Sequence, residues 1–178
     1  MKHFYDKIQG WGDFKKIYRQ QVKDAQDGAH FVEVGAWLGK STACMAVEII
    51  NSDKKIQFDV IDTWKGSKEH KKFAVVKKDT LYKDFLKNMK PVKKQINPIR
   101  TTSIEASKLY EDESLDFVFI DASHEYKHVK EDIKHWLPKV KKGGTFGGDD
   151  IRWESVQKAV GELLPGYKNH KRYWSFVK

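Results

Sequence analysis

The chain has 178 residues, 39% of them hydrophobic, and this bulk suits one domain with a sizeable core. The single cysteine, Cys44, excludes an internal disulfide, and no apolar run approaches the roughly 20 residues that span a bilayer. The formal net charge is +9, but the lysines are scattered and arginine is rare, so we favour a solvated surface over a nucleic-acid-binding one, with attraction to an anionic partner as the alternative.

The first residues lack the apolar stretch of a signal peptide, so we expect a cytoplasmic protein. Apolar residues at helical spacing, among them Ile17 and Tyr18, predict a helix over residues 13–25, and Gly28 is a plausible stop. Residues 1–28 are therefore interpreted as a leading helical segment.

Strands and helices alternate along the rest of the chain. We predict strands at 29–34, 56–61, 96–100, 115–121 and 144–150, helices at 41–50, 79–89, 103–110, 125–137 and 151–164, a loop or broken helix at 63–78, and one or two closing strands at 167–178. This alternation predicts an α/β fold, a doubly wound and mainly parallel sheet of about seven strands with helices on both faces. We expect one domain over residues 1–178, with Cys44 as a small core residue.

A glycine turn at residues 35–39 follows the first of these strands. Gly35 allows a ligand to approach the backbone closely, and the helix after the turn offers free N–H groups. The turn is not a dinucleotide fingerprint, because Trp37 stands where the second glycine belongs. Asp62 ends the next strand, where an acid can bind a ribose. The pattern favours a ribose-bearing cofactor without a pyrophosphate; the alternatives are a tight turn at Gly35 and a local cap at Asp62.

Acidic residues close two later strands of the predicted sheet. Asp121 ends one strand, and Asp149 with Asp150 ends the next. If these strands are parallel neighbours, three carboxylates converge at the ligand-binding edge. Like charges held together raise one another's pKa unless a cation compensates, which favours a hard divalent ion, magnesium before zinc. The alternative for Asp149 and Asp150 is capping of the helix that follows.

These residues together resemble the class I S-adenosylmethionine-dependent methyltransferases, whose fold is Rossmann-like. The segment 33–39 resembles the family's glycine motif around the methionine part of the cofactor, and Asp62 matches the acid that holds the ribose. Residues 102–106 resemble the segment that lies against adenine, which places Ser103 on the adenine side. The resemblance implies cofactor contacts at Glu33, Gly35, Ala36, Trp37, Gly39, Ser41, Asp62, Thr63, Ser103 and Asp121.

A narrower resemblance covers residues 115–151, which are similar to the metal-dependent sugar O-methyltransferases of antibiotic pathways and their uncharacterised relatives. It implies that Asp121, Asp149 and Asp150 bind Mg²⁺, and that Asp121 and His124 are catalytic, with His124 as general base. The implied reaction is magnesium-dependent O-methylation of a small hydroxylated acceptor, a sugar or another vicinal diol. The alternative for His124 is a solvent-facing residue at the start of a helix.

Two other functions stay open. A nucleic-acid methyltransferase fits the basic charge, but the Asn/Asp-Pro-Pro-aromatic segment that such amino-methylating enzymes commonly carry is absent after Asp121. A non-catalytic module that binds S-adenosylmethionine is the second. A nicotinamide-dependent oxidoreductase fits poorly, because its phosphate-binding glycines are missing. The oligomeric state is not predicted, and we expect no membrane partner.

The six tryptophans divide into two groups by position. Three follow strand ends on the ligand side and either line a flat substrate or pack: Trp37, Trp64 and Trp153. The other three are assigned to packing: Trp11, Trp136 and Trp174.

Overall fold

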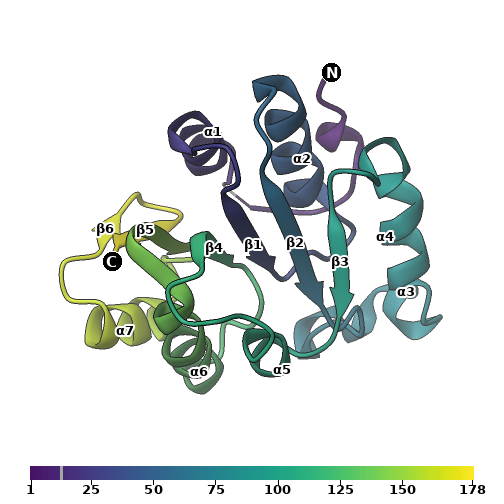
Figure 1. Ribbon diagram of the computed structural model, residues 1–178. Helices are drawn as coiled ribbons and strands as arrows, with labels where there is room; N and C mark the ends of the chain where they lie inside the picture. Colours follow the sequence, from purple (N-terminus) through teal and green to yellow (C-terminus); the bar gives the residue numbers. More distant parts are fainter. Residues whose placement is uncertain (13) are drawn as a thin grey trace.

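A computed structural model of the protein describes residues 1–12 and 14–178. One sheet of seven strands runs through it in the order β3-β2-β1-β4-β5-β7-β6 (Figure 1). The strands are β1 (His30–Val34), β2 (Gln57–Asp62), β3 (Asn97–Arg100), β4 (Leu115–Ile120), β5 (Val140–Gly148), β6 (Lys168–Asn169) and β7 (Trp174–Val177). The first five are parallel, and β7 is antiparallel to both of its neighbours. The predicted doubly wound, mainly parallel sheet is confirmed.

Helices cover both faces of the sheet, as predicted. Figure 1 shows α1, α2 and α4 on one side and α5, α6 and α7 on the other. The α-helices are α1 (Lys15–Asp24), α2 (Lys40–Ser52), α3 (Ala74–Lys77), α4 (Leu81–Met89), α5 (Ser103–Ser107), α6 (Tyr126–Trp136) and α7 (Glu154–Leu163). Short 3₁₀ helices are η1 (Tyr5–Lys7), η2 (Lys68–Lys72), η3 (Lys90–Val92) and η4 (Leu137–Lys139).

The core has two parts because successive side chains of a strand point to opposite faces. Phe31 of β1 and Phe117 of β4 pack with α1, α2 and α4. Val32 and Val118, the next residues along the same strands, pack with α6 and α7. Strands buried on both faces need continuous apolar sequence, which is why these segments lack a polar alternation.

Several element boundaries differ from those predicted. β5 begins at Val140 rather than at residue 144, across an irregularity in its pairing with β4. α7 begins at Glu154 rather than at 151, because Asp150 has a positive φ of 58° and a turn follows it. Segment 63–78 holds two short helices, η2 and α3, joined at Phe73.

The bounds of α5 and α1 also differ from those predicted. α5 ends at Ser107 rather than at residue 110, and its N-cap is Thr102, whose hydroxyl accepts a hydrogen bond from the Glu105 N–H. α1 begins at Lys15, and the predicted start at Asp13 lies outside the described residues.

Three of the tryptophans and the cysteine are buried in the core. Trp136 and Trp174 are buried, as predicted, and Trp64 joins them in the core, where its indole N–H donates to the Trp37 carbonyl oxygen. Cys44 is fully buried in α2, and burial raises the pKa of its thiol to about 12. Without a bound metal ion the thiol therefore keeps its proton, and Cys44 lies in the core, as expected. Within the described residues, no helix combines the length and the apolar character that crossing a membrane requires.

Candidate active site

A cavity of about 850 Å³ opens beyond the carboxyl ends of the central strands, and this volume suits a cofactor together with a small ligand. It lies where strand order reverses between β1 and β4, which is the usual ligand position in open α/β sheets. Its walls come from the glycine turn, the ends of β2 and β4, the β5–α7 turn, residues 10–12 and residues 66–73. Among the predicted cofactor contacts, the walls include Gly35, Ala36, Trp37, Ser41, Asp62, Thr63, Ser103 and Asp121.

The glycine turn is fixed by close packing as well as by its place at the cavity. Gly35 has a φ of 93°, and a Cβ built there would lie 1.9 Å from the Asp121 carbonyl oxygen. Gly39 is the N-cap of α2 with a φ of 90°, and a Cβ there would lie 2.6 Å from Met89 Cε. Gly35 borders the cavity, whereas Gly39 lies behind the turn against α4. Each glycine therefore has a packing reason of its own.

Glu33 lies beneath the turn rather than in the described cavity wall. Its buried carboxylate accepts hydrogen bonds from the Tyr18 hydroxyl at 2.7 Å and from the Thr42 hydroxyl. Burial raises the pKa of Glu33, while hydrogen bonds from Ser41, Thr42 and Tyr18 oppose that shift. The residue thus ties α1 and the start of α2 to β1, which positions the turn above it.

Asp62 borders the cavity and also organises the turn. Its Oδ2 accepts hydrogen bonds from the N–H groups of Ala36 and Trp37 at 2.9 and 3.0 Å, and its Oδ1 accepts from the Trp64 N–H at 2.7 Å. The local capping that the sequence left open is therefore present. The ribose contacts of Asp62 and of its neighbour Thr63 stay predictions.

Ser103 lies at the start of α5 and borders the cavity. Its hydroxyl donates to Asp132 Oδ1 and accepts from the Trp136 indole N–H at 2.8 Å. The buried Asp132 thus holds Ser103 in place from α6. The adenine contact of Ser103 stays a prediction.

Asp132 should make the protein less stable as pH rises. Burial raises the pKa of its carboxyl from 3.8 to about 6. Between these two pKa values the folded protein holds a proton that the unfolded chain has released, so the free energy of unfolding falls by roughly 2 kcal/mol between pH 4 and pH 7. Asp132→Asn should remove this contribution. Urea unfolding of both proteins at the two pH values measures the difference; equal pH dependence would contradict a raised pKa.

An acidic cluster lies on the opposite wall, at the ends of β4 and β5. Ligand atoms of Asp121, His124 and Asp150 all lie within 4.8 Å of one another, and His124 Nε2 is 2.7 Å from Asp150 Oδ2. Asp149 borders the same cavity, but its Oδ1 accepts the Asp150 N–H at 2.9 Å. Among the described residues, the group at ligand distance therefore contains His124 and two of the three predicted acids.

The electrostatics of this cluster favour a bound cation. Burial and the nearby charges of Asp149 and Asp150 raise the pKa of Asp121 well above its usual range. The hydrogen bond to Asp150 raises the pKa of His124 against the opposing effect of burial. Such a shift for Asp121 means that its ionised form lacks compensation. Carboxylate oxygens whose negative charge is not compensated are suitable ligands for Mg²⁺. The residues present therefore fit the ion that the resemblance implies.

Aromatic side chains form a wall that the sequence did not reveal. The Trp37 ring lies 4.3 Å from His70 and 5.5 Å from Phe73, measured between centroids. Trp11 stacks on His70 at 6.1 Å and borders the cavity with 58% of its surface exposed, so its assignment to packing was incomplete. We call Trp11, Trp37, His70 and Phe73 the aromatic wall. Segment 63–78 carried no periodic signal for it, but the glycines on either side of Trp11 were a hint.

Trp153 has a different role from the aromatic wall. Its ring stacks on His124 at 4.8 Å between centroids, and both residues border the cavity. This contact and the ion pair to Asp150 hold the imidazole from two sides. His124 is therefore not a solvent-facing residue at a helix start.

Residues 32–151, more than half of the chain, match a family model described as a methyltransferase domain. The chain belongs to this methyltransferase family. Family and fold together make it an S-adenosylmethionine-dependent methyltransferase, which agrees with the glycine turn and the cavity beside it. A search of curated proteins finds no match to the methyltransferase.

Solved structures share the fold of the methyltransferase at low sequence identity. The O-methyltransferase NovP matches with a TM-score of 0.63 and 17% identity, over 92% of this chain and 79% of that chain. CalS11, a TDP-rhamnose 3′-O-methyltransferase of calicheamicin biosynthesis, matches with a TM-score of 0.60 and 12% identity, over 89% and 75%. Fibrillarin from Aeropyrum pernix, solved with natively bound S-adenosyl-L-methionine, matches with a TM-score of 0.57 and 12% identity, over 90% and 72%. These likenesses establish the Rossmann-like class I fold.

Proposed function

We propose that the methyltransferase methylates a hydroxyl oxygen of a small acceptor, a sugar or another vicinal diol, with the help of Mg²⁺. The observation that carries this proposal is the cluster of Asp121, His124 and Asp150 in the wall of the cofactor cavity. Asp121 and Asp150 would hold the ion, with Asp149 beside them. The likeness to NovP and CalS11, two O-methyltransferases, supports an oxygen acceptor.

The reaction is a displacement at the methyl carbon. A bond forms between the acceptor oxygen and this carbon while the carbon–sulfur bond breaks, and the sulfur leaves as the neutral thioether of S-adenosylhomocysteine. Such a reaction needs positioning above all. When bound, Mg²⁺ would polarise the acceptor hydroxyl and lower its pKa.

The chain's own residues would position the reactants and take the proton. The turn at 35–39 and Asp62 would bind the methionine and ribose parts of the cofactor, and Ser103 would lie beside its adenine. The aromatic wall would exclude water from the sulfonium. His124, held by Trp153, would accept the hydroxyl proton.

A chelator experiment tests the metal and the acceptor class together. Transfer of labelled methyl groups to a panel of sugars, nucleotide sugars and catechols is measured with Mg²⁺ and after chelation. We expect transfer to a vicinal diol that disappears on chelation and returns with added Mg²⁺. Full activity in chelated protein would remove the metal from the mechanism, and transfer only to nitrogen acceptors would contradict the acceptor class.

A nucleic-acid acceptor is the second candidate, because basic side chains border the cavity. They are Lys40, Lys68, Lys72, Arg152 and Arg172. These residues equally suit an anionic small acceptor, and Lys68 is already paired with Glu125 at 2.9 Å. Salt-dependent retention on RNA together with methyl incorporation into RNA would favour the nucleic-acid acceptor.

A further inference from the structure

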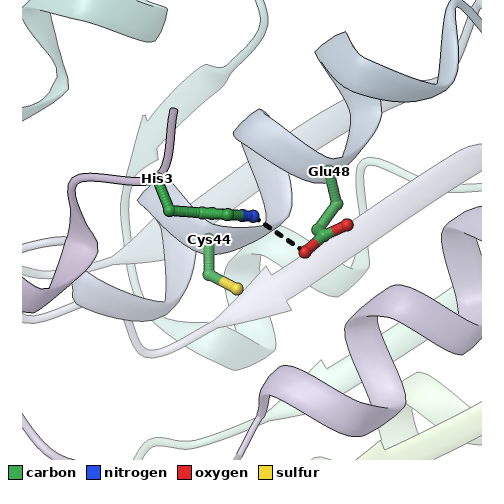
Figure 2. A group of neighbouring side chains, drawn as sticks. All are labelled: His3, Cys44 and Glu48. Atoms are coloured by element: carbon green, nitrogen blue, oxygen red, sulfur yellow. Dashed lines mark ion pairs between the residues drawn. The ribbon is translucent and has the colours of Figure 1, made fainter. Parts of the chain in front are cut away.

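A second group of metal-ligating side chains lies apart from the active-site cavity. His3 of the N-terminal segment lies over α2, where Cys44 and Glu48 occupy positions one turn apart (Figure 2). Their ligand atoms all lie within 4.8 Å of one another. A spacing of four residues places two side chains on one face of a helix, so α2 offers a sulfur and a carboxylate to the same point.

The side chains of His3 and Glu48 already contact each other beside α2. His3 Nε2 lies 3.0 Å from Glu48 Oε1, close to the separation of two ligands on one small ion. Arg19 Nε donates to the same oxygen at 2.7 Å. The His3 ring rests edge-on against Tyr5, and its buried Nδ1 has no hydrogen-bond partner among the described residues.

We propose that His3 Nε2, Cys44 Sγ and the Glu48 carboxylate bind a Zn²⁺ ion, with water as the fourth ligand. One sulfur, one nitrogen and one oxygen suit a borderline ion such as Zn²⁺, whereas Mg²⁺ prefers oxygen alone. On binding, the Cys44 thiol loses its proton to solvent, and thiolate and carboxylate together balance the charge of the ion. Arg19 then serves as an outer partner that orients Glu48.

Such an ion would tether the N-terminal segment to the domain. After His3 the chain passes along α2, where Tyr5 and Ile8 are buried. It then reaches the cavity wall at residues 10–12. A bond network between His3 and α2 would therefore fix the stretch of chain that carries Trp11. The site is structural in this role, and it is separate from the acidic cluster at the ends of β4 and β5.

Cobalt titration of the metal-free protein tests the proposal. Because the chain has one cysteine, a cobalt–thiolate charge-transfer band can arise only from Cys44. We expect a band that saturates at the intensity of one Co²⁺–thiolate site per chain and disappears when Zn²⁺ displaces the Co²⁺. Outer partners alone change metal affinity roughly 10- to 100-fold, so His3→Ala and Glu48→Gln should each weaken binding by about 100-fold or more. His135→Ala, a matched histidine change on α6, should leave the band intact.

The same titration separates this site from the active site. Co²⁺ bound by Asp121 and Asp150 in the active site gives no thiolate band, so Asp150→Asn should keep the band. Zn²⁺ should also raise the unfolding temperature of the parent more than that of His3→Ala. Absence of the band at excess Co²⁺ would overturn the proposal. A band in His3→Ala and Glu48→Gln as strong as that of the parent would also overturn it. These two variants test the site without replacing Cys44, whose burial in the core makes Cys44→Ala a risk to folding.

Discussion

The Asp121→Asn variant should lose magnesium-dependent methyl transfer and yet unfold at a higher temperature than the parent protein. Burial and the charges of Asp149 and Asp150 raise the pKa of Asp121, so its ionised form destabilises the metal-free fold. A neutral amide removes that repulsion but is a poor ligand for Mg²⁺. A gain of about 1 kcal/mol would raise the unfolding temperature by roughly 2–4 °C in a chain of this size.

Three measurements separate the two effects. Labelled methyl transfer should fall to the level of the chelated parent, thermal unfolding in chelator should shift upward, and calorimetry should show nearly unchanged binding of S-adenosylhomocysteine. Asp6→Asn is the matched control, because the Asp6 side chain is 73% exposed, and it should change none of these. Chelator-sensitive turnover in Asp121→Asn at the parent rate would show that the metal does not depend on Asp121.

His124→Ala completes this comparison, because it removes the proposed base instead of a carboxylate ligand. The rate should fall by about 10²–10⁴-fold, the usual contribution of general base catalysis, while cofactor affinity stays near that of the parent. A variant that keeps the parent rate would remove His124 from the proton transfer.

The Gly35→Ala variant should lose both stability and cofactor binding. Its Cβ would lie 1.9 Å from the Asp121 carbonyl oxygen, and its φ of 93° disfavours any side chain. Because the obstacle is backbone and not a flexible side chain, β1 and the loop after β4 would have to separate. We expect a loss of roughly 3 kcal/mol or more in the free energy of unfolding.

Gly161→Ala is the control for this substitution. Gly161 lies inside α7, and no heavy atom lies within 4 Å of a Cβ built there. Alanine should stabilise the helix by about 0.8–1 kcal/mol. Urea unfolding of both variants gives the free energies, and calorimetry gives the affinity for S-adenosylhomocysteine. Parent-like values for Gly35→Ala would mean that the two strand ends do not approach as closely as described.

Much of the fold was predictable because buried parallel strands leave a strong mark in sequence. The apolar run Leu115–Ile120 has to be buried on both faces, and the helices predicted on either side supply that cover. Gly35 and Asp62 were predictable for a related reason, since strand ends of a parallel sheet meet at one edge. The position of each residue along a strand then fixes its place at the cavity.

Other parts of the site depend on tertiary contacts that leave no local signal. Asp149 and Asp150 are adjacent in sequence, but among the described residues the group at ligand distance includes Asp150 and not Asp149, and no sequence pattern reveals the positive φ of Asp150. His70 and Phe73 lie in a Lys-rich segment without periodicity, and their position depends on contacts with Trp37. Trp11 reaches this group from a segment distant in the chain, so helical or strand spacing could not reveal it.

The Asp62 carboxylate accepts three hydrogen bonds from the backbone, and these bonds restrict how the affinity for the cofactor can be changed. A carboxylate offers about four lone-pair positions, so little capacity is left for an incoming sugar hydroxyl. Ligand recognition and loop architecture then draw on the same two oxygens. Substitutions at this position should alter both together, and selectivity for the cofactor would have to evolve through neighbouring residues instead.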